Sequence, residues 1–120
     1  MIRVATLTVL AAMFMAGSLL QADQGAGAAP TAAAVAQGQK VFASQKCSLC
    51  HAIAGKGNKN GPLDDVGTKL SAADIRAWVV TPVEMSKKHS TTRKPPMKSF
   101  ASLPQADLDA LVAYLQSLKK

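Results

Sequence analysis

Five consecutive residues constrain this 120-residue chain most: Cys-Ser-Leu-Cys-His at positions 47–51, which contain both of its cysteines. On one turn of helix, residues three positions apart lie on the same face. Cys47 and Cys50 can therefore bond to one edge of a single flat group, and His51 follows with a ring nitrogen that can bind a metal. This C-x-x-C-H pattern is typical of covalent c-type haem attachment. The pattern predicts one haem c, with its iron, covalently bound per chain.

Two other kinds of site use the same residue types. A redox-active dithiol also has cysteines three positions apart, but it is usual in an alternating strand–helix sequence, and this chain shows no such alternation. A zinc site needs four ligands, and only the two cysteines, His51 and His89 are at hand without carboxylates. Haem attachment is the preferred interpretation, and the dithiol and zinc readings are kept as alternatives.

The N-terminal residues have the pattern of a secretory signal peptide. Arg3 supplies a positive charge, residues 4–20 carry no charge, and small residues near position 28 suit a cleavage site. We expect residues 1–29 to be a signal peptide. The alternative is an uncleaved membrane anchor, because the apolar run approaches the length of a spanning helix. Residues 30–36 are expected to be a linker and residues 37–120 one domain, located in the periplasm or on the outer face of the cytoplasmic membrane.

The net charge of the chain, +7, indicates the kind of partner. Removal of residues 1–29 takes away Arg3 and Asp23, one charge of each sign, so the charge of the exported domain stays +7. A basic carrier suits redox proteins with acidic docking faces. Nucleic acid is not expected as a partner, because no basic patch is interleaved with aromatic residues and the expected compartment does not suit it. Membrane contact is expected only if the N-terminal segment is retained.

Three helices are expected, and the fold class is all-α. The first covers about residues 32–45, where Gly38 suits a close crossing with another helix. The middle helix begins at a capping box formed by Ser71 and Asp74. The last begins at a similar capping box formed by Ser102 and Gln105. Its apolar stripe consists of Leu108, Leu111, Val112, Leu115 and Leu118.

Loops are expected between these helices, over residues 55–67 and 83–102, and no strand is expected. A loop as long as the second one is usually functional or disordered. An exported domain of about 90 residues with such loops buries little apolar surface by itself. A covalent haem would supply the missing part of its core.

The long loop contains the candidates for a second iron ligand. Met97 follows Pro95 and Pro96, and each proline fixes its own backbone φ angle, so the chain before Met97 is stiff. Methionine opposite histidine raises the haem potential and suits electron transfer. Met85 is expected to be a packing or exposed residue. His89 lies in a charged run and is expected at the surface, although it leaves a bis-histidine haem open as an alternative.

From about Gly38 to Lys119 the chain resembles a class I monohaem c-type cytochrome, the small bacterial cytochrome c. The resemblance rests on the haem-attachment pattern, on Asn60-Gly61-Pro62-Leu63, on Trp78, on Pro-Pro-Met97 with Phe100, and on residues 111–115 of the last helix. It implies the cytochrome c fold, with three to four helices and long loops wrapped around one covalent haem. One departure is Lys98, because the family often has proline directly after the ligand methionine.

The resemblance also implies roles for individual residues. His51 and Met97 would be the axial iron ligands, and Pro62 would present its backbone carbonyl to the second ring nitrogen of His51. Trp78 would donate its indole N–H to a haem propionate, with ordinary burial as the alternative. The first and last helices would form the crossed pair of the family, in which Gly38 and Phe42 meet Tyr114 and Leu115.

The leading functional hypothesis is an exported electron-transfer protein and not an enzyme, since two axial ligands leave no open position on the iron. The alternative is a haem-bearing subunit of a larger periplasmic oxidoreductase complex, such as a dehydrogenase, a sulfur-oxidising complex or an oxidase. A gas-binding or peroxide-reacting protein would need a loosely held Met97. Basic residues are expected to ring the haem edge and steer partners, or else only to keep the protein soluble: Lys87, Lys88, Arg93, Lys94 and Lys98.

Overall fold

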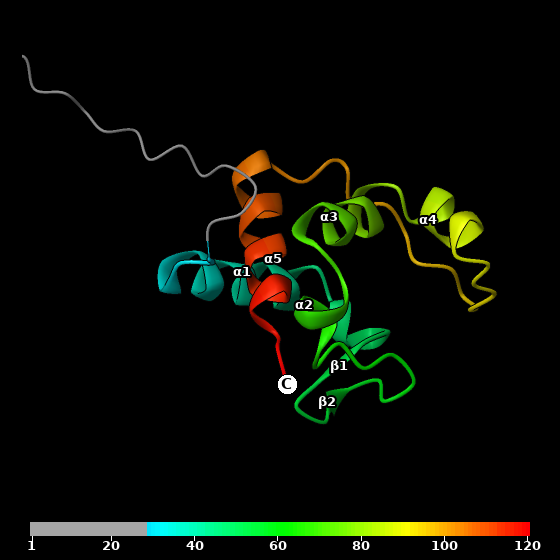
Figure 1. Ribbon diagram of the computed structural model, residues 1–120, viewed down its shortest axis with the longest axis horizontal. Coiled ribbons are helices and arrows are strands. Elements are labelled where there is room, and N and C mark those ends of the chain that lie inside the picture. Colours follow the sequence, from blue (N-terminus) through cyan, green and yellow to red (C-terminus); the bar gives the residue numbers. More distant parts are fainter. Residues whose placement is uncertain (1–28) are drawn as a thin grey trace, which may run out of the picture.

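The computed structural model of the protein describes residues 29–120 and is built from short helices (Figure 1). The expected signal peptide lies outside the described residues except for its last position. Within them, no helix is long and apolar enough to cross a membrane. The elements are α1 (Ala32–Ser44), the 3-10 turn η1 (Cys47–Leu49), β1 (Ala52–Ile53), β2 (Lys56–Gly57), α2 (Val66–Lys69), α3 (Ala72–Val80), α4 (Pro82–Lys88) and α5 (Gln105–Ser117). This content confirms the all-α prediction.

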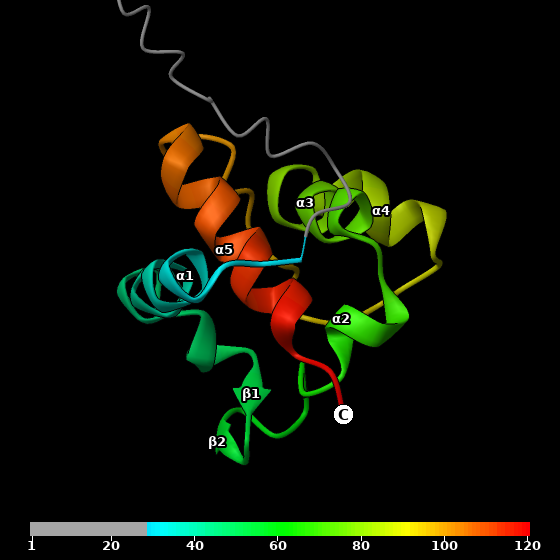
Figure 2. The same cartoon turned by 60° about the vertical axis from the view of Figure 1, so that its left-hand side comes forward.

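Helices α1 and α5 cross at the centre of the fold, as both ribbon views show (Figures 1 and 2). Gly38 makes the crossing possible, because a Cβ atom there would lie 2.5 Å from the Cβ of Tyr114 and would overlap the carbonyl oxygen of Ala110. One turn further along α1, the ring of Phe42 meets that of Tyr114 edge to face, with 5.8 Å between the ring centroids. The crossed helix pair implied by the resemblance is therefore present.

The apolar face of α5 forms the centre of the core. Helix α3 packs on the same helix, and its N-terminus is closed as predicted: the Ser71 hydroxyl oxygen accepts the backbone N–H of Asp74 at 3.1 Å. Buried side chains from α1, α3, α5 and the segment after Met97 meet there. They are Val41, Ile75, Val79, Phe100, Leu108, Leu111, Val112, Tyr114 and Leu115.

The predicted loop over residues 83–102 is wrong in its first part, because α4 occupies Pro82–Lys88. Pro82 stands in the first turn of that helix, where its missing N–H is not needed and its fixed φ angle is already helical. We expected a break at this proline, yet the chain only changes direction there between two helices. Met85 is buried on the inner side of α4, with 6% of its surface exposed.

Helix α1 begins at Ala32, after Thr31 as its N-cap, as predicted for the first helix, and residues 32–36 of the expected linker are part of it. Two further features differ from the predictions. Helix α5 begins after Pro104 with no side-chain cap, so the expected capping box of Ser102 and Gln105 is absent. A small hairpin of β1 and β2, each two residues long, is present where no strand was expected. It has Gly57 at φ 104°, a backbone conformation that favours glycine.

Candidate functional site

The haem-attachment segment is a tight turn directly after α1. Lys46 adopts a left-handed conformation with φ 56°, and η1 then brings residues 47–51 into one turn. The Cys47 carbonyl accepts the N–H groups of Cys50 at 3.1 Å and His51 at 3.0 Å. Cys47 is half-buried and Cys50 is exposed, and no disulfide joins them. The turn therefore brings the two thiols and the imidazole together, as the spacing predicted.

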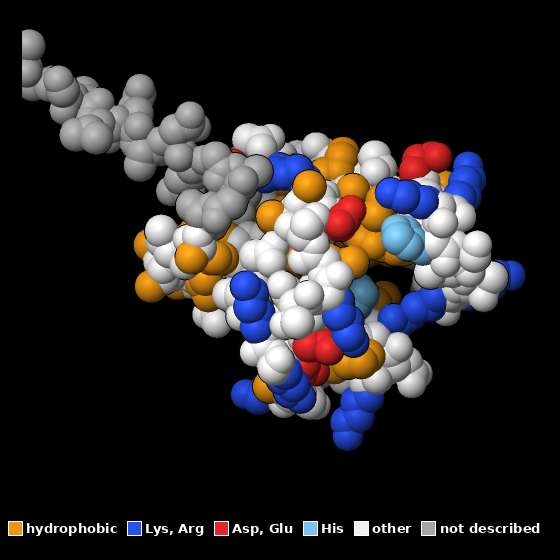
Figure 3. Space-filling view, viewed as in Figure 1, with side chains coloured by type: hydrophobic (Ala, Val, Ile, Leu, Met, Phe, Trp, Pro, Cys, Tyr) orange, Lys and Arg blue, Asp and Glu red, His pale blue; other side chains and the backbone are white. Residues whose placement is uncertain are grey.

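A cleft opens between this turn and the segment around Met97. It consists of two adjoining cavities of about 350 and 330 Å³. Figure 3 shows the hollow with hydrophobic side chains on its walls. The two cavities share six lining residues and so lie against the same side chains: Cys47, His51, Arg93, Pro96, Met97 and Phe100. Apolar side chains of the core, among them Phe42, Ile75 and Leu111, close the inner end.

One ring nitrogen of His51 is already bonded to the protein. Its Nδ1 lies 3.2 Å from the carbonyl oxygen of Gly61. A carbonyl only accepts hydrogen bonds, so Nδ1 carries the hydrogen and, in the neutral ring, Nε2 keeps a free lone pair. Burial lowers the pKa of His51, the bond to Gly61 opposes that shift, and the charge of Arg93 adds to it. The hydrogen bond thus orients the ring, and burial favours the neutral form, which is the form that binds iron.

The carbonyl that orients His51 belongs to Gly61 and not to Pro62, which corrects the role implied by the resemblance. Ala52 bridges to the segment around Pro62: its N–H donates to the Gly61 carbonyl at 2.9 Å, and its own carbonyl accepts the N–H of Leu63 at 2.9 Å. This register turns the Gly61 oxygen toward β1 and His51. The side chain of Pro62 is exposed.

Met97 is half-buried and lines both cavities together with His51. Two hydrogen bonds fix the chain directly after it to the end of α3. The Phe100 N–H donates to the Val79 carbonyl at 2.9 Å, and the Ser99 hydroxyl donates to the Val80 carbonyl at 2.6 Å. These bonds hold the thioether of Met97 beside the same space as the His51 ring. Its assignment as an iron ligand stays a prediction that this placement supports.

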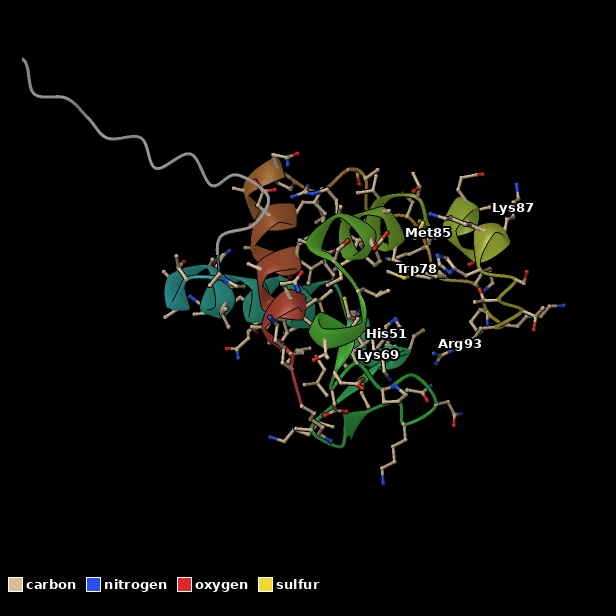
Figure 4. All side chains as sticks on the ribbon, viewed as in Figure 1. His51, Lys69, Trp78, Met85, Lys87 and Arg93 are labelled. Carbon is tan, nitrogen blue, oxygen red and sulfur yellow. The ribbon has the colours of Figure 1, made fainter. Side chains whose placement is uncertain are left out.

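The other residues considered as haem contacts lie further out. Trp78 is half-buried and lines one of the two cavities, and its ring faces that of His89 with 5.6 Å between the centroids. His89 is exposed, as predicted, but it contacts Trp78 and is not isolated in solvent. In the view of Figure 4, Trp78 lies between Met85 and His51. The hydrogen bond from Trp78 to a haem propionate stays a prediction.

Sequence reasoning placed Arg93 only among the docking charges, whereas the structure places it in the site. Its Nη2 donates to the Cys50 carbonyl at 2.6 Å, and its side chain lines both cavities. Lys98 also lines the cleft, and its charge opposes the effect of burial, which raises the pKa of the Cys47 thiol. In the sequence, Arg93 lies in a stretch of polar residues. Nothing in that stretch distinguishes a surface charge from an arginine that belongs to the site.

These residues fit a covalent haem. Two thiols and a thioether line a mostly apolar cleft, and an imidazole there offers a free nitrogen. The zinc alternative finds no support within residues 29–120, because no group of three or more His, Cys, Asp or Glu side chains there could hold a metal ion. The donor set and the apolar lining of the cleft therefore point to the same group.

Comparisons with known proteins agree with this chemistry. A family model described as Cytochrome c matches residues 35–119. A curated relative, cytochrome c oxidase subunit 2 of Alkalihalophilus pseudofirmus, is 29% identical over 99 residues, which is 75% of this chain and 27% of the relative. The chain thus spans about a quarter of the length of that relative. No solved structure matches the chain significantly.

Proposed function

Since the chain belongs to the cytochrome c family, we propose that it is an exported carrier that shuttles single electrons between respiratory or periplasmic redox partners. The family supports haem-based electron transfer. The observation that carries the finer proposal is the shared cleft of His51 and Met97, an oriented imidazole and a thioether at one space. The iron of the bound haem supplies the one-electron chemistry.

The residues of the site have separate tasks in this proposal. Cys47 and Cys50 would hold the haem by thioether bonds, and His51 and Met97 would be its two protein ligands to iron. With both ligands supplied by the protein, no substrate would bind the iron, so the protein would act as a carrier and not as an enzyme. The apolar walls of the cleft keep water from the iron, which lowers the solvent reorganisation that accompanies electron transfer.

The proposed partners are redox proteins with acidic faces. Three cationic side chains line the mouth of the cleft, Lys46, Arg93 and Lys98, and Leu49 stands beside them with 70% of its surface exposed. An apolar centre with a cationic rim suits a small, short-lived complex. Electron-transfer rates to an acidic partner should fall as ionic strength rises, because the Debye length shortens to about 8 Å at physiological salt. Rates independent of salt would rule out steering by these charges.

The periplasm is the proposed location, in keeping with the usual export of cytochrome c domains. Cell fractionation followed by N-terminal sequencing tests it directly. Recovery of the haem protein from the periplasmic fraction, starting near residue 30, is expected. Recovery from the membrane with an intact N-terminus would favour the anchored form.

A haem-bearing subunit of a larger complex is the second candidate. It is favoured by the similarity to a protein named as an oxidase subunit, of which this chain covers only 27%. Mild purification from the native membrane and periplasm separates the two candidates. A free carrier elutes alone, whereas a subunit elutes with other proteins in fixed stoichiometry.

Absorption spectra of the protein made with c-type haem maturation test the main proposal. They are recorded in the oxidised form, in the reduced form, and in the reduced form with carbon monoxide. A low-spin spectrum, with the weak red iron–methionine band when oxidised and no response to carbon monoxide, is expected. Rapid binding of carbon monoxide would mean an open or labile iron, and would favour a sensor or a haem enzyme.

A further inference from the structure

Arg93 connects two parts of the site that are far apart in sequence. It lies in the segment between α4 and α5, four residues before Met97, and its Nη2 donates to the carbonyl of Cys50 at 2.6 Å. Figure 4 shows the Arg93 side chain extending from this segment toward the part of the chain that carries His51. The bond therefore fastens the Met97 segment to the haem-attachment turn.

The same guanidinium also packs against the residue that orients His51. A Cβ atom at Gly61 would lie 2.7 Å from Nη2 of Arg93, and it would overlap Nη1 and the Cys50 carbonyl oxygen. Only glycine leaves space for this approach. Because the Gly61 carbonyl is bonded to Nδ1 of His51, the planar group of Arg93 lies directly behind the support of the histidine ligand.

Hydrogen bonds fix the chain both before and after Met97, and Arg93 provides the one before it. After it, Ser99 and Phe100 are bonded to the end of α3. Before it, the stretch from His89 has no helix or strand, and the bond from Arg93 to Cys50 ties that stretch to another part of the site. Ordering such a segment costs conformational entropy, so a charge-assisted bond on the side that has no other support helps to keep Met97 in the cleft.

We propose that Arg93 is a positioning residue for the axial ligands, which fastens the Met97 segment to the haem-attachment turn and supports the orientation of His51. The inference rests on the proposed function, because it needs Met97 as the second ligand. Lysine cannot replace this arginine fully, since its single ammonium group lacks the flat fork that packs on Gly61 while it donates to Cys50.

The variants Arg93→Gln and Arg93→Lys of the haem-loaded protein test the inference. Lys94→Gln is the matched control, because it removes the neighbouring positive charge from a residue that does not line the cleft. Three quantities are measured: the rate of carbon monoxide binding to the reduced protein, the strength of the red iron–methionine band in the oxidised protein, and the reduction potential.

Carbon monoxide should bind to Arg93→Gln about tenfold faster than to the wild type, because a hydrogen bond to a charged group holds the closed form by roughly that factor. Its red band should weaken and its potential should fall, with Arg93→Lys between it and the wild type and Lys94→Gln unchanged. Wild-type rates and bands in Arg93→Gln would overturn the inference.

Poor recovery of the glutamine variant leaves Arg93→Lys to decide, and a wild-type rate there overturns the role of the guanidinium. The failure of the proposed function looks different, because the wild-type protein itself would then bind carbon monoxide rapidly.

Discussion

Replacing Gly38 by alanine tests whether the crossing of α1 and α5 determines the stability of the fold. The added Cβ would lie 2.5 Å from the Cβ of Tyr114 and would overlap the Ala110 carbonyl, and ordinary contacts need about 1 Å more. Both neighbours belong to the rigid part of α5, so neither can turn aside as a flexible side chain would. The two helices must therefore move apart, and the packing of Phe42 on Tyr114 moves with them.

The expected loss of stability follows from two opposing effects. Overpacking a core costs about 1–3 kcal/mol, and a clash with backbone belongs to the upper part of that range. Alanine in place of glycine within a helix returns up to about 1 kcal/mol. The net destabilisation of Gly38→Ala should be about 1–2 kcal/mol. In a domain of this size that lowers the Tm by roughly 5–15 °C.

Thermal unfolding of the haem-loaded protein, followed by far-ultraviolet circular dichroism, measures this change. The matched control is Gln39→Ala, which makes an exposed substitution at the next position of the same helix and should shift the Tm by no more than a few degrees. A Gly38→Ala protein as stable as the wild type, or more stable, would refute the reasoning. The helix propensity of alanine would then outweigh the close approach of the helices.

Three further predictions concern the site and its surroundings. Met97→Ala should keep the covalent haem but lower its potential and make the reduced protein bind carbon monoxide, and an unchanged spectrum would mean that Met97 is not the ligand. Cys47→Ala should reduce covalent attachment or leave a single thioether, which the mass of the protein and the position of its haemochrome band report. Burial raises the pKa of Tyr114, so its contribution to stability is present below the usual value of about 10 and is lost as the pH rises through the folded pKa. Between neutral pH and about pH 11, the Tm of Tyr114→Phe should therefore decrease less than the Tm of the wild type.

Local signals in the sequence determine much of this fold. The turn at residues 47–51, the cap at Ser71, the apolar stripe of α5 and the crossing at Gly38 all depend on residues close together or on a strict spacing, and all are present in the structure. Such features survive because few tertiary alternatives compete with them. The predictions that were wrong concern features that depend on tertiary contacts between segments far apart in the sequence.

Helix α4 shows why the structure that follows a proline is hard to predict from the sequence. Pro82 ends α3 in the sequence pattern, as the residue before a proline avoids the helical conformation. The same Pro82 is equally suited to the first turn of a new helix, and it is fully buried there. What selects the second outcome is the burial of Met85 against the rest of the domain, and that contact is not visible in a local pattern.

The His51 support and Arg93 show the same limit at the site. Whether Gly61 or Pro62 turns its carbonyl toward the histidine depends on the register of the bridge to Ala52, and a shift of one residue exchanges the two. Arg93 in a run of polar residues looks like any solvent-facing charge. Its bond to Cys50, 43 positions away, arises only when the two segments meet across the cleft.

The position of the cleft links the fold to its cofactor. Several residues that form the core, among them Ile75, Phe100 and Leu111, also line the cavity, so the core and the binding site are one apolar surface. Without a flat apolar group between them, these side chains would face water or an unfilled space, and both are costly. A haem attached through Cys47 and Cys50 would therefore do more than supply iron, because it would fill the space against which α3 and α5 pack. Since the same group would complete the core and carry the electron, protein made without haem attachment should be largely unfolded.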